Sequence, residues 1–272
     1  MTGLVLGLFA ETPLHPGAGQ SVGAIDLPVS REATTQYPVI VGSSLKGALR
    51  DKAKEENMEE DEIDLLFGRP DRAGGLAVTD ARLLLLPIRS LSGHFRWVTC
   101  PYILQRFQRD LALIGKQVSF GIPKPERGNA VLAKDPGNGL LFLEELSFNA
   151  QPDSDAIATI AEAIAPLIKP EVVAPRLTDR IVVLNDDDFT HFAAYGLPVT
   201  AHNKLDSATK TSTNLWFQEE IPSDTLFYAL GLTRGGEEIQ DNFKSIFAKR
   251  PFLQVGGDET VGRGWCAVAF VG

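Results

Sequence analysis

The chain has 272 residues, 44% of them hydrophobic and 22% charged, which is the composition of an ordinary globular protein with one or two compact units. Its net charge of -9 excludes a uniformly basic surface, and its two cysteines, Cys100 and Cys266, exclude a disulfide framework. No apolar run approaches the roughly 20 residues of a membrane span, and the apolar N-terminus has no basic residue before Arg31, unlike a signal peptide. We therefore expect a soluble, cytoplasmic protein with no membrane partner.

The predicted elements alternate between strands and helices along the chain. Apolar and β-branched runs predict strands at 2–11, 39–41, 76–89, 95–99, 137–148, 180–185, 225–232 and 264–271. Apolar residues at helical spacing predict helices at about 45–58, 102–114, 155–168 and 241–249. A long glycine- and proline-rich loop at 12–38 and a polar hairpin at 199–220 complete the pattern. This order is typical of an α+β fold with short helices on a mostly antiparallel sheet.

Acidic residues are concentrated between Glu55 and Asp64, where seven of them occur without a lysine or arginine. The remaining 28 acidic residues nearly balance the 26 basic ones, so the rest of the surface has room for local basic patches. We interpret the acidic block itself as a solvated helix face.

The segment 256–264 is the first candidate binding site, because four glycines fall within nine residues. Glycine lets backbone N–H groups approach a ligand closely, and successive N–H groups in such a turn form an anion-binding nest. Arg263 adds a planar fork suited to phosphate. The alternative is a tight bend between two strands. Neither the Rossmann nor the Walker A spacing fits this segment.

A second candidate is the predicted helix that begins after Gly42. Helix N-termini have unpaired N–H donors and bind phosphates, and Ser43 or Ser44 fits as the N-cap. Lys46 and Arg50 lie one turn apart on the same face. The alternative is a capped surface helix with two solvated cations.

The loop at 12–38 contains two residues with chemical potential, His15 and Asp26. A histidine transfers protons near neutral pH, and an aspartate beside a phosphodiester can hold a divalent ion or orient a nucleophile. The alternatives are a structural loop histidine and an Asx-turn aspartate.

The predicted hairpin is polar and slightly basic, with Lys204 and Lys210 near its tip at 207–210. It is suited to contact a nucleic-acid backbone, with Trp216 and Phe217 expected to anchor its base in the core. A plain edge hairpin is the alternative. Metal motifs are weak: His94 and His191 lack ligand-spaced partners, and the three aspartates at 186–188 are interpreted as an exposed turn.

Four motifs in this order resemble a known family. They are His-Pro-Gly at 15–17, Ile-Asp-Leu-Pro at 25–28, Gly-Ser-Ser-Leu-Lys-Gly at 42–47 and Gly-Gly-Asp-Glu-Thr-Val-Gly-Arg-Gly at 256–264. Together they resemble the repeat-associated mysterious protein (RAMP) superfamily of CRISPR systems, and more closely the backbone subunit of the type III-B effector, the Cmr complex. The resemblance extends over nearly the whole chain.

The resemblance implies a ferredoxin-like (RRM-like) core in a single RAMP domain, with an inserted lid at about 51–135 and a protruding thumb hairpin at about 199–220. It implies copies stacked in a helical filament with CRISPR RNA, target RNA and other Cmr subunits as partners. Each thumb would kink the guide–target duplex at regular intervals.

The resemblance also implies residue roles. Asp26 would cleave target RNA with a divalent cation, Mg²⁺ or Mn²⁺, that is not tightly bound, and His15 would assist. The RNA backbone would be held by Ser43, Ser44, Lys46, Arg50, Gly256, Gly257, Gly262, Arg263 and Gly264, with Lys204 and Lys210 on the thumb. Three alternatives stay open: a non-catalytic RNA-binding filament subunit, the equivalent type III-A subunit, and a stand-alone, metal-independent endoribonuclease with His15 as the general base.

Overall fold

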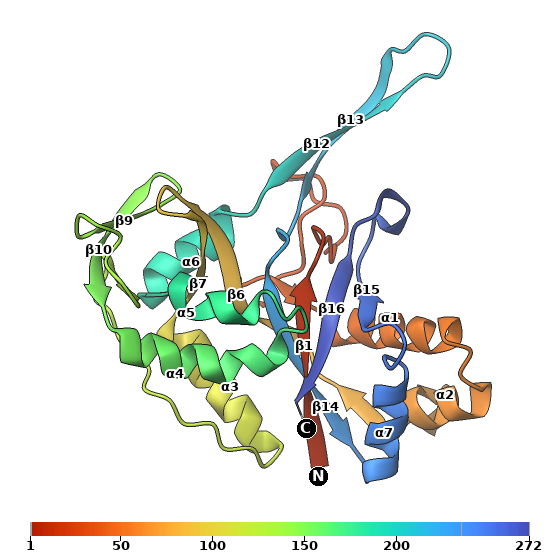
Figure 1. Cartoon of the computed structure of the whole chain (residues 1–272). Helices are drawn as coiled ribbons and strands as arrows, with labels where there is room; N and C mark the ends of the chain where they lie inside the picture. The colour runs from red at the N-terminus through yellow and green to blue at the C-terminus, as the bar shows by residue number, and fades with distance from the viewer. Residues whose placement is uncertain (1, 235, 272) are drawn as a thin grey trace.

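A central antiparallel sheet runs through the molecule (Figure 1), and the computed structural model describes residues 2–234 and 236–271. Strand β1 (Thr2–Ala10) lies between β14 (Leu226–Thr233) and β16 (Trp265–Val271), and Val5 pairs with Leu230 on one side and Val271 on the other. Shorter strands extend this sheet: β15 (Phe252–Gln254) on β16, β5 (Leu76–Val78) on β14 and β2 (Val39–Ile40) on β6.

The second half of the sheet closes on itself. Strand β6 (Ala81–Ser90) leaves β14 and continues through a ring formed by β7 (His94–Thr99), β11 (Ile181–Leu184), β8 (Asn129–Leu132), β10 (Leu146–Pro152) and β9 (Leu140–Leu143). Strand β9 returns to β6 at the pair Ser90 and Leu143, which closes a six-stranded barrel. Closure leaves no free strand edge in this half of the sheet.

Helices cover both halves of the sheet (Figure 1). Beside the open half are α1 (Gly42–Glu55), α2 (Glu60–Phe67) and α7 (Glu237–Ser245). Around the barrel are α3 (Pro101–Leu113), α4 (Ser154–Ile164), α5 (Leu177–Arg180) and α6 (Asp186–Tyr195), with the short 3₁₀ turn η2 (Ala174–Arg176). The 3₁₀ turn η1 (Ala165–Leu167) follows α4 and packs on β1 and β16. In the described ranges, no helix combines the length and the apolar character needed to cross a membrane.

One close contact shows how tightly the two halves are joined. A Cβ built on Gly7 in β1 would lie 2.0 Å from the carbonyl oxygen of Leu167 in η1. Only glycine allows the central strand and this turn to approach so closely. The buried apolar residues of both halves accordingly form one continuous core.

The predicted α+β class is confirmed, and so are most predicted strands, but several local expectations were wrong. The predicted strand at 137–148 is the hairpin of β9 and β10, because Glu144 adopts a positive φ of 49° and turns the chain. The three aspartates at 186–188 form the first turn of α6 rather than an exposed turn, since Asn185 caps that helix. Helix α4 is capped by Asp153, one residue before the expected Ser154. Helix α7 begins four residues earlier than predicted.

Candidate nucleic-acid interface

The most prominent surface feature is the hairpin of β12 (Val199–Leu205) and β13 (Ser212–Glu219), which projects from the body as a separate two-stranded sheet (Figure 1). The predicted hairpin is therefore confirmed. Its residues 203–215, here called the outer arm, are exposed except for the half-buried Asp206. Its residues 218–220, here called the hairpin root, are buried. Lys204 and Lys210 both lie on the outer arm and are exposed.

Glu219 is the centre of the hairpin root. Its carboxylate accepts a hydrogen bond from the Val29 N–H at 3.0 Å and pairs with the Arg31 guanidinium at 2.6 Å, although only 5% of the residue is exposed. Arg31 also donates to the Ala193 carbonyl at 2.6 Å. Burial of a charge is tolerated only with such compensation. The pair thus fastens the hairpin to the loop at 12–38 and to α6.

The neighbouring root residues reach the glycine-rich segment. Gln218 donates from Nε2 to the Asp258 carboxylate, and Glu220 pairs with Arg263. Glu220 also lies 3.7 Å from Nε2 of His202, whose ring stacks on Trp216 with the centroids 5.3 Å apart. The root therefore binds the glycine-rich segment through Gln218 and Glu220, and the loop at 12–38 through Glu219.

His15 belongs to this same junction. Its Nδ1–H donates to the Glu219 carbonyl at 2.8 Å, and its own carbonyl accepts from the Gly257 N–H at 3.0 Å. Because a carbonyl only accepts, the neutral ring has its proton on Nδ1 and offers Nε2 as an acceptor. The residue is 8% exposed, so the structure gives His15 a role in joining the loop to the hairpin root.

Asp26 lies beside the same strand with its side chain exposed. Its Oδ2 accepts from the Phe217 N–H at 2.8 Å. The next residue, Leu27, donates to the Phe217 carbonyl at 3.1 Å and accepts from the Glu219 N–H at 3.0 Å. The loop therefore adds to β13 like a short parallel strand, and this contact fixes the Asp26 carboxylate at the base of the outer arm.

A pocket of about 400 Å³ opens at this carboxylate. Its lining includes Asp26 and Ser21 from the loop, and Asn214 and Trp216 from β13. The expectation that Phe217 anchors the hairpin in the core was wrong, because 43% of that residue is exposed. The base is anchored instead by the polar contacts of the hairpin root, and the half-buried Trp216 lines the pocket.

The glycine-rich segment forms a tight bend. The Gly257 N–H donates to His15, the Gly262 N–H to the Glu259 carbonyl and the Gly264 N–H to the Pro13 carbonyl. A Cβ on Gly256, which has a φ of 88°, would lie 2.5 Å from the His15 carbonyl oxygen. The bend was the alternative considered from the sequence. Anion binding by the amides of Gly257, Gly262 and Gly264 is disfavoured because they already have acceptors, and Arg263 already has Glu220.

Helix α1 begins at Gly42, earlier than the predicted N-cap at Ser43 or Ser44. The Gly42 N–H donates to the Asp80 carboxylate at 2.7 Å, so an acidic side chain already caps this end. Ser43 and Ser44 are exposed, and Lys46 lines a second pocket. That Ser43, Ser44 and Lys46 hold RNA stays a prediction. Because Asp80 already accepts from the Gly42 N–H, such binding would depend on these side chains more than on the N–H groups of the helix N-terminus.

Arg50 has a structural role that the sequence did not indicate. Its guanidinium pairs with Asp64 at 2.7 Å and Glu60 at 2.9 Å, and it donates to the Gly68 carbonyl. These hydrogen bonds, that to Asp64 above all, raise the pKa of the guanidinium. The acidic block is therefore more than a solvated face, because part of it joins α2 to α1.

A tightly bound metal does not fit the described residues, because no group of three histidine, cysteine or acidic side chains lies together among them. At the base of the outer arm, Asp26 supplies a single carboxylate, and one of its oxygens already accepts from Phe217. Mg²⁺ usually binds through one or two carboxylates together with substrate phosphates and water. The residues present therefore fit only an ion that substrate helps to hold.

Sequence reasoning missed Arg31, Gln218, Glu219, Glu220 and Asp258, which join the hairpin to the body. Their partners are distant in the chain: Arg31 and Glu219 are 188 residues apart. One local signal was present, because the predicted hairpin at 199–220 ends in three consecutive polar residues, whereas an anchor in an apolar core would require apolar ones.

Comparison with known proteins gives consistent results. The family model of the RAMP superfamily matches residues 9–267. The chain is 36% identical to the CRISPR system Cmr endoribonuclease Cmr4 of Pyrococcus furiosus, over 98% of this chain and 95% of that protein. It is 27% identical to the CRISPR system CMR subunit Cmr4 of Saccharolobus solfataricus, over 94% and 92% of the two chains. The crystal structure of oligomeric Cmr4 from Pyrococcus furiosus superposes with a TM-score of 0.81 at 33% identity, covering 99% of this chain and 98% of that chain.

Proposed function

The chain belongs to the RAMP superfamily, and from that premise we propose that it is the backbone subunit of a type III-B CRISPR ribonucleoprotein. In this role it binds CRISPR RNA and cleaves complementary target RNA at regular intervals. A relative 36% identical over almost the full length is an endoribonuclease of the Cmr system, which supports cleavage. A solved relative is oligomeric, which supports stacking of copies into a filament with other Cmr subunits.

The observation that carries this proposal is the position of Asp26. Its exposed carboxylate lies at the base of a projecting hairpin and is held there by the Phe217 N–H at 2.8 Å. The adjacent pocket of about 400 Å³ is lined by Trp216 and Asn214, which offer a stacking surface and an amide for a nucleotide. A carboxylate fixed beside such a pocket can act on one phosphodiester per subunit.

The hairpin suggests how the geometry for cleavage arises. An outer arm inserted between nucleotides would turn one nucleotide out of the duplex, which allows its 2′-hydroxyl, the phosphorus and the leaving oxygen to align. Such alignment supplies a large part of the rate enhancement in a displacement at phosphorus. Base pairing with the guide supplies sequence specificity, so the protein needs to hold only backbone.

Asp26 is the candidate catalytic residue, and we propose that it works with a divalent cation, Mg²⁺ or Mn²⁺. When bound, such an ion would neutralise charge that develops on the phosphate oxygens. The free oxygen of Asp26 is the proposed protein ligand for this ion. His15 is proposed to position the loop rather than to transfer a proton, because its ring is buried and bonded to Glu219.

The backbone of the guide is proposed to lie along α1 and the surface of the glycine-rich bend. Ser43, Ser44 and Lys46 offer hydroxyl and ammonium donors there, and Lys204 and Lys210 extend the basic surface onto the outer arm. In the finer fold proposal, the core around β1 is ferredoxin-like, residues 51–135 include the lid, and the projecting hairpin is the thumb.

The test is cleavage of guide-matched RNA by the assembled complex containing Asp26→Asn. An asparagine oxygen still accepts from the Phe217 N–H, so the loop should keep its position while the charge is lost. Asp187→Asn, which removes an exposed carboxylate from α6, is the matched control. We expect regularly spaced cuts with wild type and the control, none with Asp26→Asn, and none after chelation of divalent ions.

Two other results would change the proposal. If the Asp26→Asn complex assembles and cuts like wild type, the chain is a non-catalytic RNA-binding filament subunit and the chemistry lies elsewhere. If cleavage continues in EDTA but is lost in His15→Gln, the metal-independent mechanism with His15 as general base replaces the one proposed here.

A further inference from the structure

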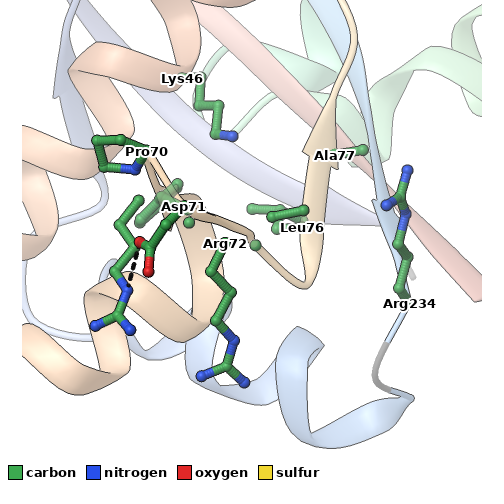
Figure 2. Close-up of a pocket in the computed structure, with 12 residues that line it drawn as sticks. Lys46, Pro70, Asp71, Arg72, Leu76, Ala77 and Arg234 are labelled. Carbon is green, nitrogen blue, oxygen red and sulfur yellow. Dashed lines mark ion pairs between the residues drawn. The ribbon is translucent and has the colours of Figure 1, made fainter.

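A basic pocket of about 580 Å³ lies away from the hairpin root, between α1, the end of β14 and a short hairpin (Figure 2). That hairpin consists of β3 (Gly68–Arg69) and β4 (Arg72–Ala73). Four cationic side chains line the pocket: Lys46, Arg69, Arg72 and Arg234. They come from three segments that are distant in the chain, so the fold itself brings the charges together.

Most of this positive charge is not balanced within the chain. Arg69 pairs with Asp71 at 2.9 Å, the ion pair drawn in Figure 2. Among the residues that the structure describes, Lys46, Arg72 and Arg234 have no ion-pair partner. Arg50, one turn from Lys46 on the same helix, has two carboxylates. In a chain with a net charge of -9, three unbalanced cations around one hollow attract an anion.

The pocket wall is a well-defined structure. Gly68 has a φ of 79°, and a Cβ there would lie 2.5 Å from the Gly74 nitrogen. A Cβ on Gly74 would lie 2.4 Å from the Leu66 carbonyl oxygen. The Arg234 N–H donates to the Gly75 carbonyl at 2.9 Å, which fastens the end of β14 to this wall. The exposed side chains of Arg72 and Arg234 therefore extend from fixed backbone.

We propose that this basic pocket binds the sugar–phosphate backbone of RNA, with Lys46, Arg72 and Arg234 as phosphate ligands. The inference rests on the proposed function and extends its RNA path beyond α1 and the glycine-rich bend. Lys46 belongs to both sites, and the exposed hydroxyls of Ser43 and Ser44 precede it by two or three residues. Guanidinium groups bind phosphate oxygens in pairs without reading a base, so the contact is independent of sequence.

RNA suits the pocket better than an acidic segment of a protein. Protein interfaces usually have a fully desolvated apolar centre with aromatic anchors. The large apolar residues at this pocket, Phe67 and Leu76, are 4% and 2% exposed and belong to the core instead. The exposed lining has four cationic side chains against one carboxylate, Asp71, and only small apolar residues such as Pro70 and Ala73, which resembles a nucleic-acid groove more than a protein-binding surface.

The experiment measures binding of the full-length chain to fluorescent single-stranded RNA across a series of salt concentrations. The test variant is Arg72→Ala/Arg234→Ala, and the control is Arg109→Ala/Lys134→Ala, which removes two exposed cations from the barrel half. Each phosphate contact contributes about 0.7 to the slope of log affinity against log salt for single strands. We expect the test variant to bind more weakly and to lose about 1.4 from that slope, while the control keeps the wild-type slope.

Equal slopes for the test variant and wild type would overturn the inference. So would unchanged RNA binding together with weaker self-association by size-exclusion chromatography, because the pocket would then bind a neighbouring protein. The proposed function fails on a separate result. It would be contradicted if the assembled complex with Asp26→Asn cut like wild type, whatever salt slopes the binding assay gives. The slope is measured on the full-length chain without cleavage, and the cuts are measured in the assembled complex, so the two ideas fail independently.

Discussion

The hairpin root and the outer arm belong to the same two strands, yet their surroundings are opposite. Gln218, Glu219 and Glu220 are buried and bind the glycine-rich bend and the loop at 12–38. On the outer arm, Leu205 and Leu215 are 51% and 57% exposed. A two-stranded hairpin alone is only marginally stable in water. The root therefore fixes where the hairpin leaves the body, and the outer arm depends on a partner for further contacts.

This difference explains why the root is polar. An apolar root would pack without defined direction, whereas the polar root side chains bind both the glycine-rich bend and the loop at 12–38 through directed hydrogen bonds and ion pairs. Those segments include the loop that holds Asp26 next to Phe217. The hairpin root thus sets the candidate catalytic carboxylate in a fixed position relative to the outer arm.

The largest expected effect is a difference in stability between a substitution in the hairpin root and one in the outer arm. Glu219→Ala removes the partner of Arg31 and the acceptor of the Val29 N–H, so we expect about 3 kcal/mol loss of unfolding free energy. Leu215→Ala on the outer arm should change that free energy by less than about 0.5 kcal/mol. Urea unfolding followed by circular dichroism measures both. Similar losses for the two variants would show that root and arm contribute alike.

A smaller loss of stability is expected from substitutions in the glycine-rich bend that the root binds. Gly256→Ala combines a positive φ with a clash against the His15 carbonyl, so we expect more than about 2 kcal/mol of destabilisation. Gly262 also has a positive φ, of 79°, but a Cβ there meets nothing within 4 Å. Gly262→Ala should therefore cost about 1 kcal/mol. Thermal unfolding of the two variants gives the order, and a reversed order would contradict this packing.

Much of the fold could be predicted because its signals are local. The apolar run of β1 and the helical spacing in α3, which starts at Pro101 and is followed by Gly115 with a φ of 76°, depend on neighbours in sequence. Helix α6 was missed although Asn185 and the three aspartates after it form a typical N-terminus, because consecutive acids were interpreted as a turn. The local signal was there, and the wrong alternative was chosen.

Tertiary pairing could not be predicted in the same way. The barrel closes through Ser90 and Leu143, which lie on strands with no shared sequence pattern. Arg50 fitted a phosphate ligand by its spacing from Lys46, yet α2 brings Asp64 and Glu60 to it. Spacing shows which residues share a face, but the partner of a charge depends on which element packs there. The outer arm was easier to predict from the sequence, since its contacts are local.

The smallest effect concerns the turn at the end of the outer arm. Asp206 accepts from the Thr209 N–H at 2.7 Å and the Ala208 N–H at 2.9 Å, and these bonds, with that to Thr209 first, lower the pKa of its carboxyl below 3.8. Because the pKa of Asp206 is lower in the folded turn than in the unfolded chain, its ionised carboxylate stabilises the turn at any pH above the unfolded pKa. This stabilisation is lost as the pH falls through the folded pKa. Asp224, near the root, differs because burial raises the pKa of its carboxyl. Carboxyl-detected NMR titration should therefore give a midpoint below 3.8 for Asp206 and above 3.8 for Asp224. A midpoint for Asp206 that is not lowered would mean that the outer arm does not form this turn without a partner.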